Sequence, residues 1–179
     1  MKTKATFTIL LSLILSTGWG QQLTQTFSWH GLTLNYPSNY IITDKEYDSE
    51  EDMYSFGCDC DDEDVLSMMQ FAFNNVPELN SSTKEEKQQG CEMSIEEIFS
   101  VYNQLFDSFK GGPITQNTSL TYPNAMATFT VTLGETGDKL KGKAVTIVKG
   151  SYFIVCTMQA EDSTHLKELE AIANSIRVN

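Results

Sequence analysis

The chain has 179 residues, of which 40% are apolar, and 24 acidic residues outnumber 12 basic ones for a formal net charge of −12. This length and apolar fraction are typical of one globular domain and exclude a disordered chain. A chain this acidic repels phosphate backbones and anionic lipid headgroups, so a nucleic-acid partner is not expected.

Residues 1–20 have the order of a cleaved export signal. Lys2 and Lys4 form a positive start, Phe7–Leu15 is a short apolar run, and the small residues Gly18 and Gly20 precede Gln21. The run is far shorter than the ~20 apolar residues of a transmembrane helix, so no membrane insertion is expected after cleavage. We expect a signal peptide over 1–20, a single domain over 21–179, and a secreted or periplasmic protein.

The first part of the mature chain is predicted to form short strands separated by turns. Apolar alternation and turn residues place them at 24–29, 32–36, 40–43, 53–58 and 65–73. The polar tract 78–89 has no apolar period and is predicted as a long exposed connection.

Most of the negative charge lies in one window, Asp44–Asp64. The window holds eleven carboxylates against the single Lys45, a formal charge of −10. It is interpreted as an acidic, cysteine-containing insertion, a pair of hairpin loops around the strand at 53–58. Because such carboxylates repel one another unless solvated or neutralised, the window is a candidate contact surface for a cation or a protein partner.

An amphipathic helix is predicted over Ser94–Lys110. Its apolar residues follow helical spacing and are assigned to one face: Ile95, Ile98, Phe99, Tyr102, Leu105, Phe106 and Phe109. Ser94 and Glu97 form a candidate capping box, and Gly111, Gly112 and Pro113 end the helix.

The remaining chain predicts three strands and a second helix. Thr128–Leu133 alternates apolar residues with threonines, and 143–149 and 152–159 flank a tight turn at Gly150–Ser151. A helix beginning at Asp162 carries the apolar stripe Leu166, Leu169, Ile172, Ala173 and Ile176. Strands joined mainly by hairpins form an antiparallel sheet, and the two helices must cover its faces. The predicted fold class is α+β, an α/β/α sandwich.

The two ends of this domain resemble the PsbP-like family. The segment 31–40 (GLTLNYPSNY) is similar to the family's opening, and the final hairpin, Glu161–Asp162 and a helix ending in NSIRV are similar to its close. The resemblance spans about Thr24–Val178. The family includes the extrinsic photosystem II subunit, a Ran-binding import factor and exported bacterial proteins. The resemblance therefore implies a binding or assembly module without shared catalytic residues.

The four cysteines are Cys58, Cys60, Cys91 and Cys156. An oxidising compartment favours disulfides, and Cys58 and Cys60 point to the same face of an extended strand. We predict a disulfide between Cys91 and either Cys58 or Cys60. Cys156 alternates with Ile154 and Met158, so we predict that it faces the core and is more buried than the other three.

Two alternatives for the window involve metal ions. Zinc or copper on Cys58, Cys60 and Cys91 is disfavoured, because the C-x-C spacing is tight and no histidine lies nearby in sequence. An EF-hand is rejected because Asp64 and Gln70 replace its glycine and glutamate. A weak, irregular calcium site is left as a hypothesis, and a solvated acidic loop is the simpler alternative. The candidate calcium ligands are Asp59, Asp61, Asp62 and Glu63.

The sequence contains no recognised catalytic motif. His30 and His165 belong to no metal or nucleophile motif, and Gly111–Gly112 is not followed by the Lys-Ser/Thr pair of a phosphate loop. We hypothesise an exported, non-enzymatic binding or assembly module that needs no cofactor and whose acidic loops contact a cation or a basic protein. The alternative is a thiol-disulfide or metal-dependent protein centred on Cys58-Asp59-Cys60.

The export hypothesis predicts cleavage between Gly20 and Gln21. Mass analysis of the N-terminus of the protein from its native host is expected to show a chain that begins at Gln21. An intact Met1 on a membrane-bound protein would contradict both the export and the oxidising compartment.

Overall fold

The structure, a computed structural model, describes residues 22–134 and 136–178. The predicted signal peptide and its cleavage site lie outside the described residues. None of the helices in the described part of the chain is long and apolar enough to cross a membrane.

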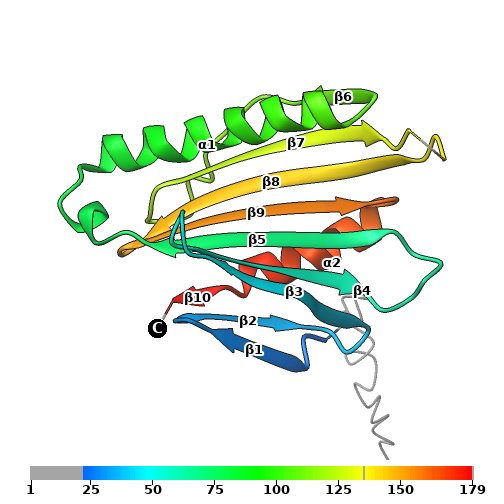
Figure 1. The fold of residues 1–179 in the computed structure, drawn as a ribbon, viewed down its shortest axis with the longest axis horizontal. Coiled ribbons are helices and arrows are strands. Elements are labelled where there is room, and N and C mark those ends of the chain that lie inside the picture. The colour runs from blue at the N-terminus through cyan, green and yellow to red at the C-terminus, as the bar shows by residue number, and fades with distance from the viewer. Residues whose placement is uncertain (1–21, 135, 179) are drawn as a thin grey trace, which may run out of the picture.

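The fold is built on a seven-stranded antiparallel sheet (Figure 1). In spatial order its strands are β3 (Tyr40–Asp48), β4 (Met53–Cys60), β5 (Ser67–Asn75), β9 (Tyr152–Ala160), β8 (Lys139–Lys149), β7 (Asn124–Thr132) and β6 (Ser108–Gly111). A smaller sheet contains β1 (Gln25–Trp29), β2 (Leu32–Tyr36) and β10 (Arg177–Val178). The helices are η1 (Pro77–Asn80, a 3-10 turn), α1 (Lys84–Leu105) and α2 (Ser163–Asn174).

Both faces of the large sheet carry an apolar core, because side chains alternate along each strand. Under α1, Ile95 belongs to one buried cluster with Phe129 and Val131 of β7. On the other face, α2 and the small sheet cover a cluster that includes Phe56, Phe71, Phe73, Leu34 and Leu169. Helices therefore lie on both sides of an antiparallel sheet, and the predicted α+β sandwich is confirmed.

The predicted start of α1 is wrong. The helix begins at Lys84, with a reciprocal capping box between Thr83 and Glu86, so much of the tract predicted as a connection is helical. The first two turns of α1 are polar and mostly exposed, which is why apolar spacing did not reveal them. Leu105 is 70% exposed. The sequence pattern assigned Leu105 to the same face as Ile95. However, it follows Ile95 by ten residues and so lies about 80° from that residue around the helix, which explains its exposure.

Other boundaries differ less. Phe109 belongs to β6 and not to α1, and the strands β6 and β10 were not predicted. The hairpin of β8 and β9 and the N-cap of α2 at Asp162 are confirmed.

Close packing beneath α1 predicts opposite effects for two glycine substitutions. A Cβ at Gly142 would meet the Phe129 ring and lie 2.8 Å from the Met158 carbonyl oxygen. Phe99 and Tyr102 pack edge-on against that ring and hinder its movement. Gly142→Ala is expected to lower the free energy of unfolding by ~1–3 kcal/mol in denaturant titrations.

Gly90→Ala is the matched control. The new Cβ would lie 4.0 Å from Phe153, in ordinary contact, within the interior of α1. The substitution is expected to stabilise the protein by up to ~1 kcal/mol because alanine is the better helix former. Equal stability of the two variants would contradict this packing.

Candidate functional site

The acidic window forms a ribbon at one edge of the large sheet. β3 is the edge strand, and it pairs with β4 from Tyr40 opposite Cys60 to Asp48 opposite Met53. A register shift between Thr43 and Glu46 interrupts this pairing. β3 continues to Asp48 instead of ending at residue 43, so the first part of the window is a strand; the hairpin tip lies at one end of β4 and the β4–β5 loop at the other (Figure 1).

Ten of the eleven carboxylates in the window are exposed. Within the described residues the ion pairs are Lys143 with Glu170 and His165 with Asp162, so no carboxylate of the window has a cationic partner there. The negative charge therefore faces solvent.

The hairpin tip, residues 46–52, combines this charge with an aromatic side chain. Tyr47 is 51% exposed, stacks on Tyr54 with ring centroids 4.7 Å apart, and donates a hydrogen bond to Asp52 at 2.8 Å. Asp48 accepts hydrogen bonds from the backbone N–H groups of Glu50 and Glu51 at 2.8 and 3.3 Å. A shallow hollow of about 620 Å³ lies beside these residues. The tip is therefore an ordered acidic surface.

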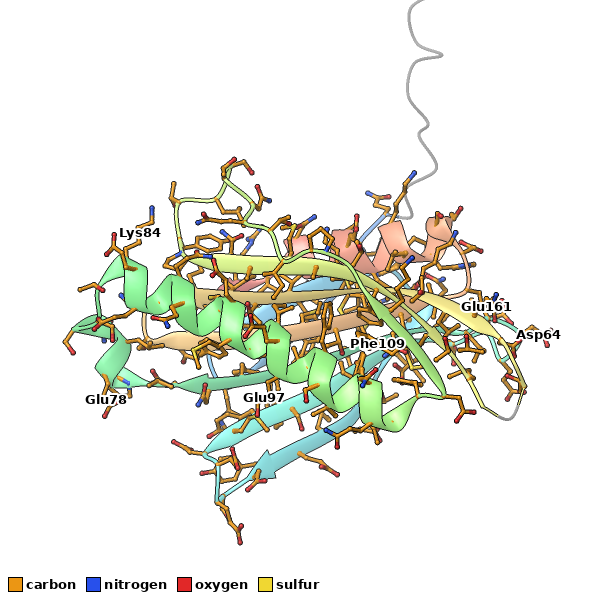
Figure 2. All side chains as sticks on the ribbon, turned by 90° about the horizontal axis from the view of Figure 1, so that it is seen from above. Asp64, Glu78, Lys84, Glu97, Phe109 and Glu161 are labelled. Carbon is orange, nitrogen blue, oxygen red and sulfur yellow. The ribbon has the colours of Figure 1, made fainter. Side chains whose placement is uncertain are left out.

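The other end of the ribbon holds residues 61–64. Asp62 caps its own turn by accepting from the Asp64 N–H at 3.1 Å. Leu66 and Glu161 exchange two hydrogen bonds, which place the start of α2 beside this loop, as the neighbouring Asp64 and Glu161 in Figure 2 show. A second acidic surface lies here, away from the tip.

The four candidate calcium ligands do not converge. Asp59 lies in β4 and accepts a hydrogen bond from Thr43 at 2.8 Å, whereas Asp61, Asp62 and Glu63 lie in the exposed loop. The other carboxylate oxygen of Asp59 is buried and has no hydrogen-bond partner among the described residues. Among the described residues, no three His, Cys, Asp or Glu side chains are grouped so as to hold a metal ion. Weak calcium binding stays a prediction without an assembled ligand set.

The predicted disulfide is absent, because all four cysteines are free thiols. Cys91 faces the core under α1, whereas Cys58 and Cys156 belong to the core on the opposite face of the sheet. The sheet itself separates Cys91 from the C-x-C pair. Cys156 does face the core, but it is not the most buried, since Cys58 and Cys91 are equally inaccessible.

Burial also controls the acidity of these thiols. It raises the pKa of Cys58 to about 12, and the nearby Asp59 adds to the shift. Burial raises the pKa of Cys91 to about 11 and also raises that of Cys156. Redox chemistry requires an accessible thiolate, which this environment opposes at Cys58. The folded state therefore holds these protons more tightly than the unfolded chain does. The resulting contribution to the free energy of unfolding is fully present below the unfolded thiol pKa of about 8.5, and it is lost as the pH rises through the folded values of 11 to 12.

The two histidines have local roles. His30 stacks on Tyr54 with ring centroids 4.0 Å apart, in a turn where its backbone φ is 43°. His165 lies in the first turn of α2, and its Nδ1 is 3.0 Å from Asp162 Oδ2. Among the described residues, neither imidazole ring forms a hydrogen bond with a cysteine or a hydroxyl group, although the His30 carbonyl accepts from the Tyr152 hydroxyl at 3.4 Å.

Sequence reasoning missed a cleft of about 490 Å³ on the α2 side of the sheet. Strands β8 and β9 form its floor, and the C-terminal half of α2 and the segment before β7 form its walls. Three distant parts of the chain build it, so no local pattern marks it. The one available signal was the alternation of Lys143, Val145, Ile147 and Lys149, which puts lysines and apolar residues on one strand face.

Burial of three thiols predicts a selective labelling pattern. Native protein treated with iodoacetamide at pH 8 without reductant is expected to be modified at Cys60 alone, because Cys60 is the cysteine that is partly exposed. Unfolding in guanidinium should expose all four, as counted by mass spectrometry of the intact protein. A Cys91 peptide crosslinked to Cys58 or Cys60 in a non-reducing digest would contradict this arrangement.

Comparisons with known proteins bear on the fold. No family model matches the chain, and no curated protein matches it in sequence. Cyanobacterial PsbP (CyanoP) from Synechocystis sp. PCC 6803 is similar in structure, with a TM-score of 0.56 and 11% identity over 87% of this chain and 92% of that one. A protein from Bacteroides thetaiotaomicron VPI-5482 has a TM-score of 0.51 and 15% identity over 88% of this chain and 49% of that one. The chain therefore has a PsbP-like fold, as its opening and closing segments predicted.

Proposed function

We propose that this protein is an exported, non-enzymatic binding module whose acidic hairpin tip contacts a basic protein partner. The observation that carries the proposal is the tip itself. Its carboxylates are exposed and are not neutralised within the described residues, and they lie beside the exposed Tyr47, whose hydroxyl donates to Asp52.

Concentrated charge at the tip favours a cationic partner. Asp48, Glu50, Glu51 and Asp52 lie within five residues, and their mutual repulsion is relieved when lysine or arginine side chains approach. Tyr47 adds a contact of a different kind, because aromatic rings bind cations on their faces and are enriched at protein interfaces. A partner with basic side chains around an apolar centre fits both features.

The edge strand favours contact through side chains. β3 carries a register shift, a positive φ at Asp44 and the charged Lys45, and such features hinder the addition of another strand. We therefore infer that the partner docks on the tip and does not extend the sheet.

The fold supports the proposed class. The similarity to CyanoP is a likeness of fold, and PsbP-like proteins are in general extrinsic, non-enzymatic components. The buried Cys58 supports the same choice, because the alternative, a redox protein centred on Cys58-Asp59-Cys60, needs both thiols of the pair to react, and only Cys60 is partly exposed.

Neutralising the tip is expected to weaken binding of a basic probe. The variant replaces Asp48 and Asp52 with Asn and Glu50 and Glu51 with Gln. Asn at 48 preserves the turn acceptor, and Asn at 52 tolerates the positive φ there. Fluorescence anisotropy with labelled decalysine in 20 mM NaCl should show at least about a tenfold loss of affinity, or ~1.4 kcal/mol from four exposed pairs.

A control variant removes the same charge elsewhere. Glu78, Glu85, Glu96 and Glu97 are exposed on η1 and α1 and become Gln. The affinity of this variant for decalysine is expected to fall less than threefold. Raising NaCl to 200 mM should remove the difference in affinity between the two variants. Equal losses would show that net charge alone binds the probe and would remove the tip as the contact surface.

A further inference from the structure

The cleft on the α2 side has an apolar interior. Val145 and Ile147 of β8 and Ile154 and Met158 of β9 line its floor, and Ala173 and Ile176 line the wall that follows α2. Its volume of about 490 Å³ lies within the ~300–1,000 Å³ that is typical of small-molecule sites. It exists because α2 packs mainly on β5 and β9 and leaves part of β8 uncovered.

Two lysines of β8 line this cleft, in a chain that is otherwise strongly acidic. Lys143 and Lys149 are six residues apart on one strand, so both side chains project to the α2 face. Glu170 neutralises Lys143, with 3.2 Å between Nζ and Oε1. Lys149 lies over the ring of Tyr122, 5.8 Å from its centroid, and among residues 22–134 and 136–178 it forms no ion pair. The cleft therefore holds one unneutralised cation beside apolar surface.

The wall opposite α2 is held in place without a ligand. Asn124 is fully buried, and its side chain accepts from the Asn117 N–H at 2.8 Å and donates to the carbonyls of Asn117 and Tyr122 at 3.2 and 3.0 Å. These bonds fix the segment that carries Leu120 and Tyr122 against the cleft. A wall that is already ordered lowers the entropic cost of binding.

We propose that this cleft binds a small amphiphilic anion, an apolar chain with a carboxylate head. The chain lies against β8 and β9, where it replaces exposed apolar surface. The head pairs with Lys149, the lysine of the cleft for which the described residues provide no acidic partner. A neutral amphiphile would leave Lys149 unpaired, and a cationic one would be repelled by it, so the charge of the head decides binding.

Calorimetric titration of the purified protein with dodecanoate, below its micelle concentration, tests this site. We expect saturable one-to-one binding, and none with dodecyltrimethylammonium, which has the same chain and the opposite charge. Lys149→Gln is expected to lower the affinity for dodecanoate by at least about tenfold, or ~1.4 kcal/mol. Lys139→Gln is the matched control, because Lys139 is an exposed lysine of the same strand that does not line the cleft.

Methyl NMR of the unsubstituted protein locates the ligand independently of any variant. Dodecanoate should shift the methyl signals of Ile147 and Met158, which line the cleft, and leave those of Val131 and Leu140 under α1 unchanged. Absence of saturable binding, equal binding of the cationic amphiphile, full affinity in Lys149→Gln, or shifts confined to the α1 side would each overturn the proposal. None of these results bears on the acidic tip, since the two sites share no residue.

Discussion

The antiparallel pairing of β5 with β9 is the constraint on which the rest of the structure depends. It joins strands from opposite halves of the chain, in a register that runs from Ser67 opposite Ala160 to Asn75 opposite Tyr152. Because side chains alternate, this register puts Phe71 opposite Cys156 and Phe73 opposite Ile154, on the face that α2 and the small sheet cover. A slip of one residue would turn both rings to the other face and dismantle that core.

The helices that cover this sheet are offset from each other. α1 packs on β6, β7 and β8 across one face, whereas α2 packs on β5 and β9 across the other (Figure 2). Each face is therefore only partly covered, and the two uncovered regions differ in character. The β3–β4 ribbon extends beyond α1 as a polar, acidic edge, and the strip of β8 beyond α2 forms the apolar cleft. Both surfaces follow from one packing geometry.

The spacing of apolar residues and the turn residues predicted most of the fold. Strands such as β7 and β9 and the second half of α1 have a periodic apolar pattern within their own sequences. The start of α1 was missed because Lys84 to Gly90 contacts little of the core and is held by a cap that only Thr83 and Glu86 reveal. The disulfide prediction failed for a reason of topology. Strand alternation places Cys58 and Cys60 on one face, but it does not say on which side of the sheet Cys91 packs.

Spacing in sequence likewise could not show that Asp59 turns toward Thr43 while its acidic neighbours turn to solvent. The cleft could not be predicted from the sequence, because it is lined by α2, β8, β9 and the segment held by Asn124. Local sequence patterns indicate only how a residue is placed within its own helix or strand. Sites built between elements depend on pairings that only the folded sheet defines.

The two charged surfaces also act independently. Four strand spacings separate β3 from β8 in the sheet, which at ~4.8 Å each is about 19 Å. That distance is about twice the Debye length of ~8 Å at physiological ionic strength, so salt screens the acidic ribbon from Lys149. The net charge of −12 therefore does not prevent an anion from reaching the cleft. Occupancy of the cleft in turn leaves the electrostatic potential at the hairpin tip unchanged. One fold can therefore bind a basic partner at the tip and an anionic ligand in the cleft.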